Sequence, residues 1–124
     1  MDIEFIRKYC LSLPGTLEDI KWGADLCFTI ATKMYCVTGM ESPHKTSFKC
    51  SDEDFNSLVE RDGIIPAPYM ARNKWVMVEK PSAFSKQEWQ DYILKSYVLI
   101  GSRLPKKVQQ ELNLKLAWRT KQGP

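Results

Sequence analysis

Apolar residues recur at helical spacing near the start of the chain and again near its end. From about Asp2 to Ser12 they follow one helical face, with a capping carboxylate at the first residue and Pro14-Gly15 as the stop. A longer stripe predicts a second helix from about Lys86 to Arg103. Ser85 and Glu88 stand at capping-box spacing before it. Two helices should therefore frame the middle of the chain.

The middle of the chain has the composition of β-strands. Four short segments are rich in β-branched and aromatic residues, and Lys33 is the polar turn residue between the second and the third. They predict an antiparallel meander over residues 17–22, 26–32, 34–40 and 45–50. A helix should follow from Ser51 to Gly63, opened by a capping hydroxyl and three carboxylates. Asp52–Asp54 are also a conceivable metal cluster, but the start of a helix already accounts for them.

The segment PAPYMARNKWVMVE, residues 66–79, has a different pattern. Its prolines should stiffen the approach to a strand led by Trp75. Trp75 is expected to anchor the core, and stacking on a nucleic-acid base is the alternative. The join between the two halves, Arg72-Asn73-Lys74, is the best candidate for a contact loop. Further on, Pro105 can begin a short helical turn with Lys106, Lys107 and Gln109 pointing outward.

Strands framed by helices predict an α+β fold, with a single antiparallel sheet packed on one face by helices. The 124 residues fit one domain, expected over 1–116, followed by a loosely ordered basic tail over 117–124. No apolar run reaches the roughly 20 residues that cross a bilayer. The start of the chain has no signal-peptide pattern. We therefore expect a cytoplasmic protein with no membrane partner.

The four cysteines lie in apolar segments and form no C-x-x-C pair. Reduced thiols buried in the core account for them, and with His44 as the only histidine a zinc site has few ligands. No phosphate-binding glycine loop and no hydrolytic triad can be assembled from the sequence. We therefore expect no enzymatic activity, no metal and no cofactor.

Positive charge is concentrated near the end of the chain. Net charge is +3, but from Arg103 onward six basic residues face Glu111 alone, a local balance of +5. That end is either an anion-binding arm or a solvated terminus. Other cations lie on the expected sheet and loops, as binding to phosphates requires. The candidate nucleic-acid-binding residues are Lys33, Lys45, Lys49, Tyr69, Arg72, Asn73, Lys74, Lys106 and Lys107.

Several of these segments occur in an order that resembles one family. The motifs are Leu13-Pro14-Gly15, Lys33-Met34-Tyr35, Lys49-Cys50, Pro66 to Trp75, and Ser96 to Lys106. Over residues 2–110 the chain resembles the MmcQ/YjbR family. The resemblance implies a CyaY-like (frataxin-like) α+β fold with an N-terminal helix and a long C-terminal helix. It also implies a cytoplasmic bacterial DNA-binding protein with a double-wing arrangement of sheet and loops, and no enzymatic activity.

The chain departs from the family at Tyr69, where many members have histidine. A family role for an imidazole at that position is not carried over. The iron-binding role of frataxins is not carried over either, because Arg7 and Lys8 offset the acids of the first helix.

Three functions follow as hypotheses. The first is low-specificity DNA binding by basic residues, and the alternative is a protein-interaction or small-ligand adaptor. The adaptor would require an exposed apolar patch, whereas an evenly charged open sheet face would count against it. Handling of a metal ion is the third. The sequence does not indicate the oligomeric state.

Overall fold

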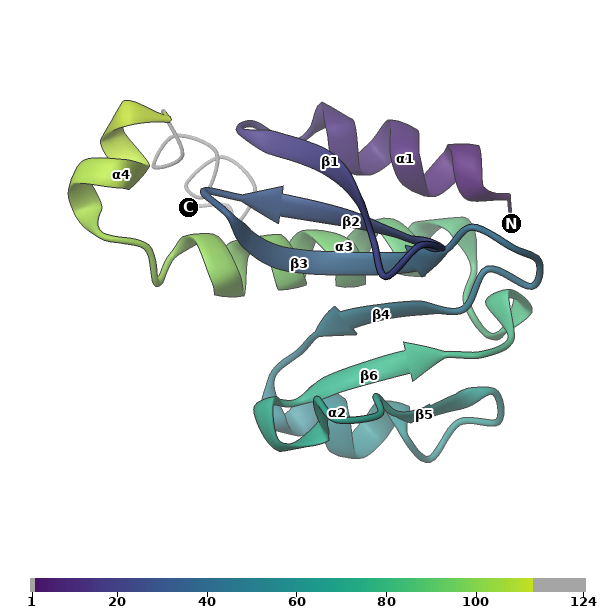
Figure 1. The fold of residues 1–124 in the computed structure, drawn as a ribbon. Helices are drawn as coiled ribbons and strands as arrows, with labels where there is room; N and C mark the ends of the chain where they lie inside the picture. The colour runs from purple at the N-terminus through teal and green to yellow at the C-terminus, as the bar shows by residue number, and fades with distance from the viewer. Residues whose placement is uncertain (1, 113–124) are drawn as a thin grey trace.

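The fold is a six-stranded antiparallel sheet with helices along one face (Figure 1). The computed structural model describes residues 2–112. The strands are β1 (Thr16–Lys21), β2 (Asp25–Ile30), β3 (Lys33–Gly39), β4 (Thr46–Lys49), β5 (Ile64–Pro66) and β6 (Trp75–Val78). Their order in the sheet is β1-β2-β3-β4-β6-β5. The first four strands form the predicted meander, and the two short ones extend the sheet beyond β4.

Four α-helices and two short 3₁₀ turns complete the described part of the chain. They are α1 (Ile3–Ser12), α2 (Asp52–Leu58), η1 (Ala71–Asn73), η2 (Pro81–Ala83), α3 (Lys86–Gly101) and α4 (Lys106–Glu111). α1 contacts β1, α3 contacts β2, β3 and β4, and α2 contacts β5 and β6. Figure 1 shows these three helices behind the sheet and α4 beyond its end. The α+β prediction, with helices on one face, is confirmed.

The helices begin where the capping residues predict. The Asp2 carboxylate accepts a hydrogen bond from the Phe5 amide at 3.0 Å. At the start of α3, Ser85 and Glu88 form both bonds of the capping box, at 3.1 and 3.2 Å. Immediately before the cap, Phe84 packs edge-on against Trp89 with ring centroids 5.0 Å apart, as a hydrophobic staple does. These local signals fix the entry of the chain into α1 and α3.

The turn between β2 and β3 differs from the sequence prediction. Lys33 is the first residue of β3 and pairs with Ile30, so the turn consists of Ala31 and Thr32. Both have positive φ, 46° and 69°, which is the pattern of a type I′ hairpin turn. That turn type is usually signalled by Asn-Gly, and a β-branched residue in this region is strained. The expectation of a turn at Lys33 was therefore wrong, because the turn lies immediately before Lys33.

An irregularity in β3 makes α3 part of the sheet's hydrogen-bonding system. Phe28 pairs with Cys36 and Thr29 with Met34, so Tyr35 is an extra, bulged residue. Its carbonyl accepts a 2.6 Å hydrogen bond from the buried Ser96 hydroxyl, in the middle of α3. The same hydroxyl accepts a 3.0 Å hydrogen bond from the Lys49 amide. One side chain thus joins α3 to the start of β3 and the end of β4.

Tyr35 extends this connection to the other helix. Its hydroxyl donates to the Cys10 carbonyl at 3.2 Å and shares a 2.7 Å hydrogen bond with the Thr16 hydroxyl. Its ring packs edge-on against Tyr97, with centroids 5.3 Å apart. Desolvation is the largest cause that raises the pKa of Tyr35, so this hydroxyl stays neutral and is available as a donor. The bulge is the place where both long helices and three strands meet.

The main core lies between the sheet and the helices. Its largest fully buried members are Trp89, Tyr35, Tyr97, Phe28 and Phe48. All four cysteines are buried and unpaired, as predicted, and desolvation raises the pKa of Cys50 to about 11.

Trp75 is buried as expected, but it is not part of this core. It pairs with Lys49 and alternates with Val76, which does belong to the core, so Trp75 lies on the opposite face of the sheet. The expectations of a core strand and of a buried tryptophan are confirmed, and the tryptophan packs on the face of the sheet away from the main cluster.

Some predictions fall outside residues 2–112. The tail over 117–124 is one, and the basic residues Lys115, Arg119 and Lys121 are others. Within the described residues, no helix is long and apolar enough to span a membrane.

We predict that Ser96→Ala lowers the free energy of unfolding by about 2 to 4 kcal/mol, because one buried and one partly buried backbone group would lose their partner and each costs about 1–3 kcal/mol. Chemical denaturation followed by circular dichroism measures the loss. Ser102→Ala, an exposed position near the end of the same helix, is the control and should stay within about 0.5 kcal/mol of the parent. A Ser96→Ala protein as stable as this control would show that the two hydrogen bonds of the Ser96 hydroxyl do not stabilise the fold.

Candidate nucleic-acid interface

The topology brings basic residues from distant parts of the sequence to one end of the molecule. β3 starts there, β4 ends there and β6 starts there, because these strands are antiparallel neighbours. Figure 1 shows η1 and the end of α3 at that end, with α4 beyond them. We call this the basic end, defined by Lys33, Lys49, Arg72, Lys74, Arg103, Lys106 and Lys107.

Lys49 holds the contact loop in place. Its ammonium group donates to the carbonyl of Asn73, and its backbone pairs with Trp75 in the neighbouring strand. Desolvation by burial is the main cause that lowers the pKa of Lys49, and the positive charge of Arg103 lowers it further. Asp52 and Cys50 act in the opposite direction without reversing the shift. Two cations are therefore crowded together at this end, which favours an anion as their partner.

The loop from Tyr69 to Lys74 combines exposure with backbone strain. Tyr69 is fully exposed, with a relative exposure of 105 %, and both Tyr69 and Lys74 have positive φ, 65° and 62°. The carbonyl of Lys74 accepts a 2.9 Å hydrogen bond from the Cys50 amide, which fixes the end of the loop. Strained backbone that the surroundings hold in place is typical of functional sites.

Arg72, Asn73 and Lys74 lie together on this loop, as the sequence predicts. Arg72 is exposed and has no acidic partner among residues 2–112. The Lys74 ammonium lies 4.9 Å from the centre of the Phe55 ring, in a cation–π contact. Lys106 and Lys107 are exposed on α4.

α4 itself is attached by a side chain that we expected to point outward. Gln109 donates to the carbonyls of Ser102 and Leu104, at 3.2 and 2.8 Å, and so caps the end of α3. The expectation for Gln109 was therefore wrong, because the carbonyl groups that end a helix need donors.

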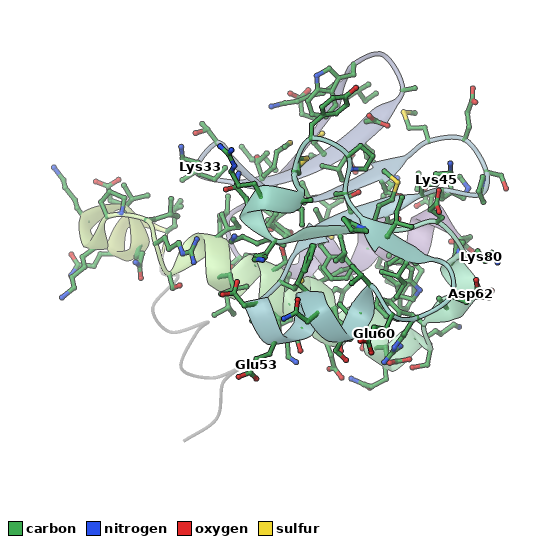
Figure 2. All side chains as sticks on the ribbon, turned by 90° about the horizontal axis from the view of Figure 1, so that it is seen from below. Lys33, Lys45, Glu53, Glu60, Asp62 and Lys80 are labelled. Carbon is green, nitrogen blue, oxygen red and sulfur yellow. The ribbon has the colours of Figure 1, made fainter. Side chains whose placement is uncertain are left out.

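Lys45 is separated from the other candidates. It lies next to Gly39, the last residue of β3, whereas Lys33 is the first residue of that strand. The Lys45 ammonium is 3.6 Å from the Glu79 carboxylate. In Figure 2, Lys45 and the Lys80–Asp62 pair lie at one end of the molecule and Lys33 toward the other. Arg61 also has an acidic partner, Glu88 at 2.8 Å. Lys45, Lys80 and Arg61 are thus ion-paired, whereas Lys33, Arg72 and Arg103 have no acidic partner in the described part of the chain. The same is true of three cations outside the basic end, Lys8, Lys21 and Lys86.

A pocket of about 370 Å³ opens at the basic end. Lys33 and Arg103 supply its charged groups. Its apolar lining comes from β3, from the approach to β6 and from the end of α3, and consists of Met34, Met70, Trp75, Ile100 and Leu104. Sequence reasoning missed Arg103 and this lining. The sequence showed the Arg103 charge, but it did not show that the end of α3 reaches the start of β3.

The described residues offer no obvious metal centre. No three histidine, cysteine, aspartate or glutamate side chains converge within residues 2–112. Asp54, one member of the acidic triplet, instead lies 3.6 Å from Lys95.

The fold and one stretch of sequence resemble known proteins. The YjbR family model matches residues 11–99. The crystal structure of Deinococcus radiodurans protein DR2400, with family-model domain DUF419, superposes with a TM-score of 0.82 at 22 % identity over 90 % of this chain and 87 % of that one. A protein from Pseudomonas syringae, Northeast Structural Genomics Consortium target PsR293, gives 0.65 at 21 % identity over 80 % and 98 %. No curated protein matches the sequence. At these identities the structures show the fold alone.

We predict that Arg103→Gln raises the pKa of the Lys49 ammonium part of the way toward its ordinary value. Removing a neighbouring positive charge favours the protonated amine, while the burial that lowers the pKa most remains. Lysine side-chain NMR titration measures this pKa. Arg61→Gln removes the same charge at a position paired with Glu88 and should leave the Lys49 pKa unchanged. Equal effects of the two substitutions would show that Arg103 and Lys49 are not neighbours.

Proposed function

The chain belongs to the YjbR family, and from this membership together with the basic end we propose that it is a non-enzymatic DNA-binding protein of low sequence specificity. The basic end would contact phosphates, with Lys33, Arg72 and Arg103 as its central cations. Lys74, Lys106 and Lys107 would extend the contact, and Tyr69 would lie against the sugar or an exposed base.

The observation that carries the proposal is the gathering of cations without acidic partners at one end of the molecule. Lys45, Lys80 and Arg61 have acidic partners, whereas Lys33, Arg72 and Arg103 have none within residues 2–112. Unpaired cations gain most from phosphate, because each contact releases condensed counterions from the nucleic acid. Lys33 begins β3, Arg72 lies on η1 just before β6, and Arg103 follows the end of α3 by two residues, so the fold brings their backbones to one end. This placement supports contact with a polyanion.

The geometry favours contacts to the backbone over reading of the bases. At the basic end, α4 is the α-helix that extends beyond the sheet. It has only six residues. A long recognition helix is the usual means of reading base edges in the major groove. Lysine and arginine contacts to phosphate set position and affinity but carry no sequence information directly. We therefore propose binding with little preference for sequence.

A second candidate, a protein-interaction adaptor, is favoured by exposed apolar residues along the edge strand β1 and its turn. Leu17, Ile20 and Trp22 are 69 %, 55 % and 68 % exposed. An unpaired edge strand with apolar side chains is a common docking feature. The DNA measurement below separates the two functions, because an adaptor without DNA affinity would show no salt-dependent binding.

We predict that Lys33→Gln, Arg72→Gln and Arg103→Gln together weaken binding to any short DNA duplex. Loss of three phosphate contacts should flatten the slope of log K against log salt by about 2 to 3. Fluorescence anisotropy between low and moderate salt, with two duplexes of unrelated sequence, measures both quantities. The affinity should fall equally for the two sequences.

The matched control removes three charges at the other end, by Lys45→Gln, Lys80→Gln and Lys86→Gln. Net charge falls by the same amount, so a long-range effect of charge alone would appear in both triple variants. The control should retain most of the slope. If the two variants lose affinity equally, or if the parent protein does not bind DNA at low salt, the proposal is wrong.

A further inference from the structure

The pocket at the basic end has the chemistry of a site for a flat ring that carries a negative charge. Met34, Met70 and Trp75 present apolar, polarisable groups, and Ile100 adds an aliphatic surface from α3. Such groups pack well against aromatic faces. A volume of about 370 Å³ lies within the range of small-molecule sites, roughly 300–1,000 Å³.

The charged groups of the pocket specify the second part of the ligand. Lys33 enters from the start of β3 and Arg103 from the residues after α3, so the two cations come from different elements. Neither forms an ion pair with another residue in 2–112. Lys49 lies close enough to Arg103 for its pKa to be lowered, so the positive charge at this place is dense. A guanidinium and an ammonium together are well suited to a phosphate group.

Competing groups do not neutralise the pocket. The carbonyls of Ser102 and Leu104 at the end of α3 already accept hydrogen bonds from Gln109. Lys49 is not among the lining residues, and its ammonium donates to the Asn73 carbonyl, so Lys33 and Arg103 are the cations that line the pocket. Lys33 directly follows the strained turn Ala31-Thr32 and lines the pocket.

We propose that this pocket binds one nucleoside monophosphate unit, with the base against Met34, Met70 and Trp75 and the phosphate between Lys33 and Arg103. The unit is either a free nucleotide or an unstacked nucleotide of a single strand, and for a strand the inference rests on the proposed function. Stacking on apolar side chains tolerates every base, which agrees with low sequence specificity. A duplex would bind at the same cations without placing a base in the pocket.

Methionine methyl NMR tests the inference directly. The sequence has five methionines, of which Met34 and Met70 line the pocket and Met40 and Met77 do not. Deoxyadenosine monophosphate and a ten-nucleotide single strand should both move the methyl signals of Met34 and Met70, through the ring current of the base. The signals of Met40 should stay in place. Inorganic phosphate alone should leave all methyl shifts nearly unchanged, and adenosine without phosphate should bind about tenfold more weakly.

Ile100→Trp is designed to fill the pocket without changing its charge. It should abolish the methyl shifts and reduce single-strand affinity by about tenfold, the loss expected for one stacked base. Duplex affinity should stay within about twofold, because the phosphate contacts remain. Met70→Ala, which removes lining instead of adding it, is the second variant if Ile100→Trp does not fold. Its effect is read from the Met34 signal.

The outcomes separate this inference from the proposed function. If duplex and single strand both bind without moving the methyl signals of Met34 and Met70, the pocket is not a nucleotide site. The proposal of DNA binding would then still stand. If the free nucleotide moves these methyl signals but neither DNA binds, the pocket is a nucleotide site and the proposed function is wrong. Absence of binding by all of these ligands overturns both.

Discussion

The hydroxyl of Ser96 is the interaction on which the arrangement of the sheet and its basic end depends. It donates to the carbonyl of the bulged Tyr35 and accepts from the amide of Lys49. A bulge leaves backbone groups outside the ladder of the sheet, and buried groups of this kind must find another partner. Because α3 supplies that partner, the start of β3 and the end of β4 are held to one point of the helix.

This constraint links the core to the candidate site. Ser96 holds the backbone of Lys49 itself and that of Tyr35, two residues after Lys33, and the same helix ends two residues before Arg103. The cations of the basic end therefore come from elements that the core fixes relative to one another. A surface of this kind needs little rearrangement to bind a polyanion, which reduces the entropic cost of binding.

Much of the fold could be predicted from local signals in the sequence. The caps at Asp2, Ser51 and Ser85 fixed the starts of three helices, because a capping side chain and its target amide are only three residues apart. The strands of the meander could be predicted because their enrichment in β-branched and aromatic residues is also a local signal. The turn at Ala31-Thr32 could not, because neither residue is typical of positive φ.

The candidate site was less accessible to sequence reasoning, because it depends on contacts between distant residues. The loop Arg72-Asn73-Lys74 does lie immediately before a strand, as expected, because Trp75 begins a strand-like run of residues. Lys45 resembles Lys49 in local sequence, yet the two stand at opposite ends of β4. Only the pairing of β3, β4 and β6 shows which cations lie together, and only the packing of α3 adds Arg103.

The most direct test of the account is a backbone amide NMR titration with a short DNA duplex. If the basic end is the interface, the largest shifts will fall at Lys33, Arg72 and Arg103, with small shifts at Lys45 and Lys80. Shifts that cluster instead around Leu17 and Trp22 on the β1 edge, or that spread evenly over both ends, would contradict it.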